Sequence, residues 1–175
     1  MRKILFILTS FTIFTIVTSC NKESDKLRNK IKQNTEIFLA SEILKDNEYE
    51  SIDSLKFIKT DTISELHEAL MYVSYLTNRS KLNLRLAELN EGNDNISSKI
   101  SLDSSTYYAQ KASDIIRNFA KYDSIRPIYL QTIFYTQIRL KNATVEKDTL
   151  KVTTDLSGNI VLAKEVLKGA ENKYK

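Results

Sequence analysis

Residues that commonly build catalytic and metal sites are scarce in this chain of 175 residues. It has one cysteine, one histidine, three glycines, one proline and no tryptophan. The glycines stand alone, which excludes a glycine-rich phosphate loop. The single histidine, His67, has no neighbouring histidine or cysteine to complete a metal site, and no G-x-S-x-G stretch exists. The 22 acidic residues could supply a carboxylate pair, but no spacing selects one. We therefore expect no metal, no cofactor and no enzymatic activity.

The chain also lacks a block of one charge sign. Its net charge is +4, and acidic and basic residues alternate in stretches such as "NKESDKLRNK" and "KGAENKYK". A nucleic-acid-binding protein would show a basic patch or stripe. The charge pattern therefore predicts no nucleic-acid partner.

Only one long apolar run is present, and it stands at the start. Ile4 to Val17 are 14 uncharged, mostly apolar residues, preceded by Arg2 and Lys3 and followed by the small residues Thr18 and Ser19. A membrane-spanning helix needs about 20 apolar residues. A short basic start, an apolar run and a small-residue exit are typical of a secretory signal peptide. We predict that residues 1–19 are this peptide.

The only cysteine follows the apolar run directly. The stretch "VTSC" (17–20) is similar to the lipobox of bacterial lipoproteins: an aliphatic residue, two small residues and a cysteine. This resemblance implies that Cys20 is acylated and becomes the first residue of the mature chain, followed by a polar tether over residues 20–26. The mature chain would then have no free thiol, 156 residues and a net charge of +2. The alternative is a buried free cysteine in an apolar N-terminal helix.

Apolar residues at helical spacing predict three helical segments. The first covers Lys26 to Lys45. The second starts with a capping box of Thr62 and Glu65 and runs to about 90–92, with an apolar side. The third runs from about 104 to 122 after a polar loop, which makes an antiparallel helical hairpin over about 62–122. The apolar side of the second segment consists of Ile63, Leu66, Leu70, Val73, Leu82, Leu86 and Leu89.

Alternating apolar and polar residues predict the strands. Residues 52–59 and the long stretch after Pro127 have this pattern, and "TLKVTTD" follows. The stretch "LSGN" predicts a turn in which Gly158 adopts a positive φ, and a further strand from Ile160 that ends as a short helix. The strands would form an antiparallel meander over about 128–163. Residues 27–175 are thus expected to form a single α+β domain with a sheet of three to four strands.

A triplet of aspartate, serine or threonine, and an aliphatic residue occurs four times. It is similar to the periplasmic O-glycosylation signal of Bacteroidetes, and this resemblance makes four hydroxyl groups candidate sites: Ser54, Thr62, Ser124 and Thr149. The structural alternative is that these residues cap helices and form turns before apolar runs. Thr62 is the weakest candidate, because its hydroxyl would serve as the helix cap.

The whole layout resembles small Bacteroidetes lipoproteins of unknown function. The likeness rests on the lipobox, the "CNKE" start, "YESIDSLKF", a long helical insert and "DLSGNIV" near the end. It implies an envelope lipoprotein held in the membrane by its lipid and brings no activity with it. Asn21 stands where an aspartate would retain a lipoprotein in the inner membrane of enteric bacteria, so the outer membrane is expected. Which face carries the protein is open.

Three functions remain open. We expect an interaction or accessory protein with a protein partner in the envelope, which would present an exposed apolar patch. The alternative is a binder of a small apolar or sugar ligand in a cleft between the sheet and the helical hairpin, lined by some of the nine tyrosines, such as those in "STYY" (105–108). Packing inside the core is the commoner role of such tyrosines. An enzyme that uses carboxylates or tyrosines is the third possibility.

Overall fold

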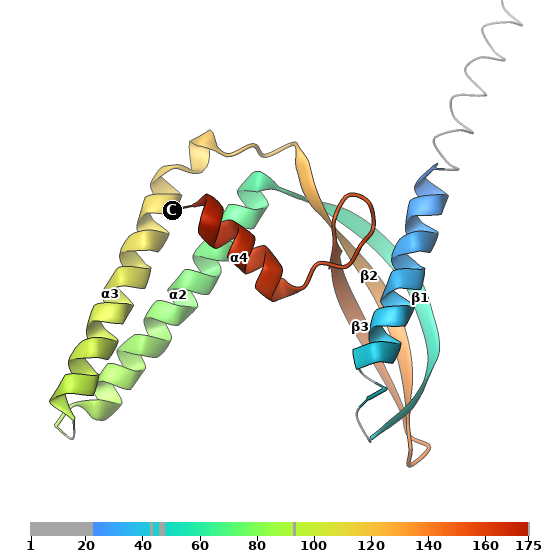
Figure 1. Ribbon diagram of the computed structural model, residues 1–175, viewed down its shortest axis with the longest axis horizontal. Coiled ribbons are helices and arrows are strands. Elements are labelled where there is room, and N and C mark those ends of the chain that lie inside the picture. Colours follow the sequence, from blue (N-terminus) through green and yellow to red (C-terminus); the bar gives the residue numbers. More distant parts are fainter. Residues whose placement is uncertain (1–22, 43, 46–47, 93, 175) are drawn as a thin grey trace, which may run out of the picture. The chain divides into compact units, whose positions relative to one another are not determined.

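The computed structural model describes residues 23–42, 44–45, 48–92 and 94–174 (Figure 1). Cys20 and the predicted signal peptide lie outside these residues. The expected α+β class is confirmed. Residues 23–42 are helical. The further elements, in chain order, are β1 (Tyr49–Ser64), α2 (Glu65–Asn90), α3 (Asn95–Arg117), a 3-10 turn (Phe119–Lys121), β2 (Pro127–Leu140), β3 (Val145–Thr154) and α4 (Ala163–Lys173).

The described chain divides into two compact units. The sheet unit combines the residues up to Asp61 with Leu130–Ile160. The helical unit combines Thr62–Tyr129 with the C-terminal residues from Val161. Each unit has its own buried apolar cluster, and each is described separately below.

The sheet unit holds three strands in the order β1-β2-β3. β2 and β3 are antiparallel, with Phe134 opposite Leu150. Two contacts join β2 to the other edge strand: the hydroxyl groups of Thr60 and Thr132 lie 2.9 Å apart, and Arg139 forms an ion pair with Asp53. β1 is longer than the strand expected over residues 52–59 and extends beyond it in both directions.

One face of the sheet is buried under the helix of residues 23–42 (Figure 1). The alternation expected for the long strand is confirmed in its middle, where residues 130, 132, 134 and 136 are buried and the odd positions between them are only partly covered. The helix contributes Ile31 and Leu39, and Phe134 lies at the centre with no exposed surface. The cluster consists of Ile31, Leu39, Leu55, Leu130, Phe134 and Val152.

A tight turn follows β3 at the stretch "LSGN", where the sequence predicts one. Asp155 accepts hydrogen bonds from the backbone N–H groups of Ser157 and Asn159, both at 2.9 Å. Gly158 has φ +84°, as expected. The strand expected from Ile160 is wrong, because only a single bridge joins Ile160 to Thr154. The chain then enters α4, whose Glu165 carboxylate accepts from the Leu162 N–H at its start.

The helical unit is built on the hairpin of α2 and α3, whose starting points differ from those expected. Ser64 caps α2 by accepting from the N–H of His67, whereas Thr62 lies in β1 and caps nothing. The expected polar loop before residue 104 is wrong, since α3 begins at Asn95. Asp94 caps it by accepting from the N–H groups of Ile96 and Ser97 at 3.1 and 3.0 Å. An aspartate side chain that receives two N–H groups fixes a helix start strongly.

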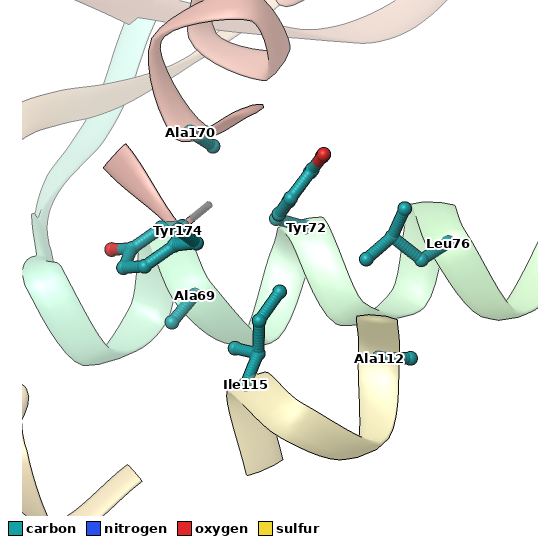
Figure 2. Close-up of a cluster of buried hydrophobic side chains, with 7 residues drawn as sticks. All are labelled: Ala69, Tyr72, Leu76, Ala112, Ile115, Ala170 and Tyr174. Atoms are coloured by element: carbon teal, nitrogen blue, oxygen red, sulfur yellow. The ribbon is translucent and has the colours of Figure 1, made fainter. Parts of the chain in front are cut away.

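The core of this unit lies at the open end of the hairpin, between the first half of α2 and the last half of α3. Figure 2 shows Ala170 and Tyr174, from α4 and its C-terminal end, on one side of α2, with residues of α3 on the other. Apolar side chains from all three helices therefore share one cluster. Its members are Ala69, Tyr72, Leu76, Ala112, Ile115, Ala170 and Tyr174.

Farther along the hairpin, serine and alanine replace large apolar residues at the contact between α2 and α3. The Ser80 hydroxyl donates to the carbonyl oxygen of Ser105 at 2.9 Å, and the Ser98 hydroxyl donates to that of Ala87 at 2.9 Å. Small side chains let helices approach closely. The large leucines of the same stretch lie on the apolar side that their spacing predicts, but α3 does not cover that side. Leu82, Leu86 and Leu89 are 50%, 41% and 73% exposed.

Candidate binding groove and exposed surfaces

The candidate modification sites lie in different settings. Cys20 is outside the described residues, so its acylation stays a prediction. Ser124 is exposed in the loop before β2, and Thr149 is exposed on the edge strand β3. Ser54 is half-buried in β1, and Thr62 is exposed near the end of that strand. The structure therefore brings none of these four hydroxyl groups together in one site.

The aspartates of the four triplets have unlike roles. Only Asp123 forms a turn, in which its carboxylate accepts from the N–H groups of Ile125 and Arg126 at 2.8 and 2.9 Å. Asp53, Asp61 and Asp148 lie within strands. Caps and turns therefore account for one triplet of the four.

His67 is exposed in the first turn of α2, as expected for a histidine without ligand partners. Its Nδ1 lies 3.1 Å from the hydroxyl oxygen of Ser64, the residue that caps the helix. The histidine thus belongs to the start of the helix. Among the residues that the structure describes, no group of three or more His, Cys, Asp or Glu could hold a metal ion.

A groove lined by tyrosines and lysines runs along α3 where α4 packs beside it. We call it the tyrosine–lysine groove. Its central hollow has a volume of about 280 Å³ and receives side chains from α2, α3 and α4. The residues that line it, apart from Leu76 and Leu167, are Tyr72, Tyr75, Tyr107, Tyr108, Lys111, Lys164, Lys168 and Glu171.

Lys111 is the side chain common to this hollow and its two neighbours of about 280 and 330 Å³. Only 16% of its side chain is exposed, and its ammonium nitrogen lies 5.6 Å from the ring centre of Tyr72 and 5.9 Å from that of Tyr107. Burial works against the charge, yet the hydroxyl group of Tyr72 raises the pKa of Lys111 above its usual value. The groove therefore holds a permanent cation between aromatic rings.

A buried carboxylate joins α4 to α2. Glu68 is 3% exposed and lies 3.1 Å from the Lys173 ammonium group and 3.0 Å from the Tyr174 hydroxyl. Lys173 also pairs with Glu65 at 3.1 Å. Hydrogen bonding from the Asp123 N–H and then from Lys173 holds the pKa of Glu65 below its usual range. The ion pairs of Lys173 and the hydrogen bond of Tyr174 therefore hold the C-terminal end of α4 against the first turns of α2.

A second feature is the row of leucines on the outer side of α2. We call Leu82, Leu86 and Leu89 the leucine stripe. Their spacing of four and three places them on one side of the helix. Ser80 and Ala87, which contact α3, lie on the other side. Large apolar residues at the start of α3, Ile96, Ile100 and Leu102, are also exposed. The far half of the hairpin thus has small residues inside and large apolar residues outside.

Sequence reasoning found this region only in part. The tyrosines of "STYY" do line the groove, whereas Tyr129 and Tyr135 lie on β2 and contribute nothing to it. The pattern that could have revealed it is Lys111, four residues after Tyr107, which helical spacing places on one face. The cleft expected between the sheet and the hairpin stays a prediction.

No helix of the described chain is long and apolar enough to span a membrane. Comparisons with known proteins give no relative for this chain: no family model, no curated protein and no solved structure matches it.

Proposed function

We propose that this protein is an envelope lipoprotein, anchored in the outer membrane through acylated Cys20, and that it binds a partner protein through the leucine stripe of α2. The proposal joins two observations. The lipobox-like stretch "VTSC" follows a signal-like run, and the leucines at helical spacing are exposed although their spacing is that of a buried face. The second observation carries the binding role.

The occupant we propose is an amphipathic helix of another protein. Leucines at a spacing of four and three form ridges that fit the surface of a second helix. A single stripe covers far less than the roughly 800 Å² per partner of a stable protein interface. A stable dimer of this chain would need more surface, so a transient partner helix fits better.

The charge around the stripe favours a protein over a lipid surface. Residues 79–103 contain four basic residues (Arg79, Lys81, Arg85, Lys99) and four acidic ones (Glu88, Glu91, Asp94, Asp103). Helices that bind the surface of anionic membranes carry an excess of lysine and arginine on their polar face. The balanced charge here removes that attraction.

The test is crosslinking of the tagged, full-length protein in intact envelopes, followed by mass spectrometry of the crosslinked peptides. The variant is Leu82→Lys with Leu89→Lys, and its matched control is Ile125→Lys with Leu156→Lys. Ile125 and Leu156 are also exposed apolar residues, 87% and 49% exposed, but lie outside the hairpin. We expect a partner whose crosslinked peptide is an amphipathic helix, lost in the hairpin variant and kept in the control.

Three results would contradict the proposal. The partner could survive the hairpin variant, or no partner could appear above background. A tagged copy could also capture only an untagged copy of the same chain, which would mean self-association in place of a partner helix.

A further inference from the structure

The Lys111 ammonium group occupies the middle of the tyrosine–lysine groove without a close counter-charge. Its nearest carboxylate among the described residues is that of Glu171, 4.0 Å away and 60% exposed. Lys111 itself is mostly buried, but Glu171 lies largely in water and at the outer limit of an ion pair, so it neutralises the lysine only weakly. The charge of Lys111 is therefore available to a bound anion.

The wall that α4 supplies adds to this positive charge. Lys164 and Lys168 are four residues apart, so both lie on the side of α4 that lines the groove. Neither forms an ion pair with any residue that the structure describes. With three lysines and Glu171, the lining has a net charge of +2. A concave surface with excess positive charge attracts anions.

The aromatic part of the lining offers flat faces with polar edges. Tyr107 is exposed, and its ring packs against that of Tyr108 with 5.5 Å between their centres. Tyr72 is buried and stacks on Tyr75 at 6.1 Å with an angle of 13°, so it supports the lining, whereas Tyr75 is exposed and offers its ring. A phenol ring can cover the C–H face of a sugar, while its hydroxyl group and the lysines bind sugar hydroxyls.

We propose that the tyrosine–lysine groove binds an anionic sugar, with Lys111 holding the carboxylate or sulfate group and the tyrosine rings, Tyr107 foremost, packing against the sugar ring. A purely apolar ligand fits less well, because Leu76 is buried beneath the rings and Leu167 is the one other aliphatic side chain of the lining. The hollow of about 280 Å³ is at the small end of ligand pockets, the size of one or two sugar rings.

This inference does not depend on partner binding by the leucine stripe. The test is isothermal titration calorimetry of the full chain, purified in detergent, with three disaccharide probes. These are digalacturonic acid, sulfated lactose and lactose, each at millimolar concentration and low salt. We expect one or both acidic probes to bind and lactose to bind at least about tenfold more weakly, since a hydrogen bond to a charged group is worth about that factor. The two acidic probes distinguish a carboxylate ligand from a sulfate ligand.

Two variants and a matched control locate the site. Lys111→Gln removes the charge and keeps a polar, slightly shorter side chain, and Lys168→Gln does the same at an exposed position, where folding is not at risk. Lys99→Gln is the control, because Lys99 is an exposed lysine of the same helix, α3, outside the groove. We expect about tenfold weaker binding of the acidic probe in the first, about threefold in the second, and no change in the control.

The proposal is overturned if neither acidic probe binds, or if lactose binds equally well. It is also overturned if Lys99→Gln weakens binding as much as Lys168→Gln, because the charge effect would then be non-specific. A thermal melt of Lys111→Gln shows whether that variant is folded. If it is not, Lys168→Gln alone decides, and unchanged binding in that variant rejects the site.

Discussion

At the residue scale, the buried carboxylate of Glu68 is the feature that most needs a physical account. Removing a carboxylate from water costs several kcal/mol unless its charge is met. Here Lys173 supplies the counter-charge and Tyr174 a hydrogen-bond donor, at 3.1 and 3.0 Å. Lys173 is partly exposed, so it keeps some of its hydration while it pairs. The cluster therefore stabilises the contact of α4 with α2.

Tyr174 gives this cluster a pH dependence. Burial, and then the hydrogen bond to Glu68, raise the pKa of Tyr174 well above its usual value of 10.0. Above that pH the unfolded chain releases the phenol proton, whereas the folded protein keeps it. The unfolded state then binds fewer protons, so the free energy of unfolding falls as the pH rises.

We predict that Tyr174→Phe lowers the free energy of unfolding at neutral pH by about 1–2 kcal/mol, because Glu68 loses a donor. Above pH 10.0 the variant should lose less stability with rising pH than the unaltered protein, since it lacks the phenol. Urea unfolding over a pH series measures both effects. The control is Tyr107→Phe, whose exposed hydroxyl group forms no hydrogen bond with a described residue. Parallel pH curves for Tyr174→Phe and the unaltered protein would refute the prediction.

At the element scale, the hairpin of α2 and α3 is assembled differently along its length. Near its base the seam contains large apolar residues such as Tyr72 and Ile115. Toward the far end it contains Ser80, Ala87 and Ser105, and two of these contacts are hydrogen bonds from serine hydroxyls to backbone carbonyls. In this far part of the hairpin, close packing of the two helices and these hydrogen bonds stabilise the contact in place of large buried side chains.

We predict that Ser105→Leu destabilises the protein by about 1–3 kcal/mol, the usual cost of overpacking a closed contact. Ser105 is buried in the seam, where its carbonyl and hydroxyl oxygens both face Ser80. The matched control is Thr106→Leu, an exposed neighbour on the same helix, which should change stability by less than about 0.5 kcal/mol. Thermal melts of both variants give the comparison. Equal effects of the two substitutions would mean that the seam has room for a leucine.

The residues at the contact between α2 and α3 also explain why the sequence could not show the leucine stripe to be exposed. A spacing of four and three predicts an apolar face but says nothing of which helix covers it. Ser80 and Ala87 carry no apolar pattern, so sequence reasoning could not recognise them as the contact. The exposure of Leu82 follows only from the packing of the two helices.

At the scale of the whole molecule, the sequence alone predicted the α+β fold class but not the tyrosine–lysine groove. Period-two alternation after Pro127 predicted β2, and helical spacing predicted the hairpin. The groove could not be predicted, because it joins Tyr72 of α2, Lys111 of α3 and Lys168 of α4, which lie far apart along the chain. It also depends on α4, for which the sequence suggested a strand first. Local patterns indicate elements, whereas sites between helices depend on packing.

The last prediction concerns the attachment of the whole molecule to the membrane. We predict that Cys20→Ala abolishes incorporation of radiolabelled palmitate and moves the protein out of the detergent phase in Triton X-114 partition. The physical reason is that each buried methylene of an acyl chain contributes about 0.8 kcal/mol, and two or more chains anchor a protein stably. The apolar run of 14 residues before Cys20 is too short to replace them.

Ser19→Ala is the matched control, because it replaces one small residue before the cysteine with another and keeps the lipobox pattern. It should be labelled and anchored like the unaltered protein. Palmitate incorporation that persists in Cys20→Ala would place the acyl chain elsewhere, and absence of label from the unaltered protein would remove the anchor altogether. Only the second result would leave the leucine stripe and the tyrosine–lysine groove without lipid attachment to the membrane.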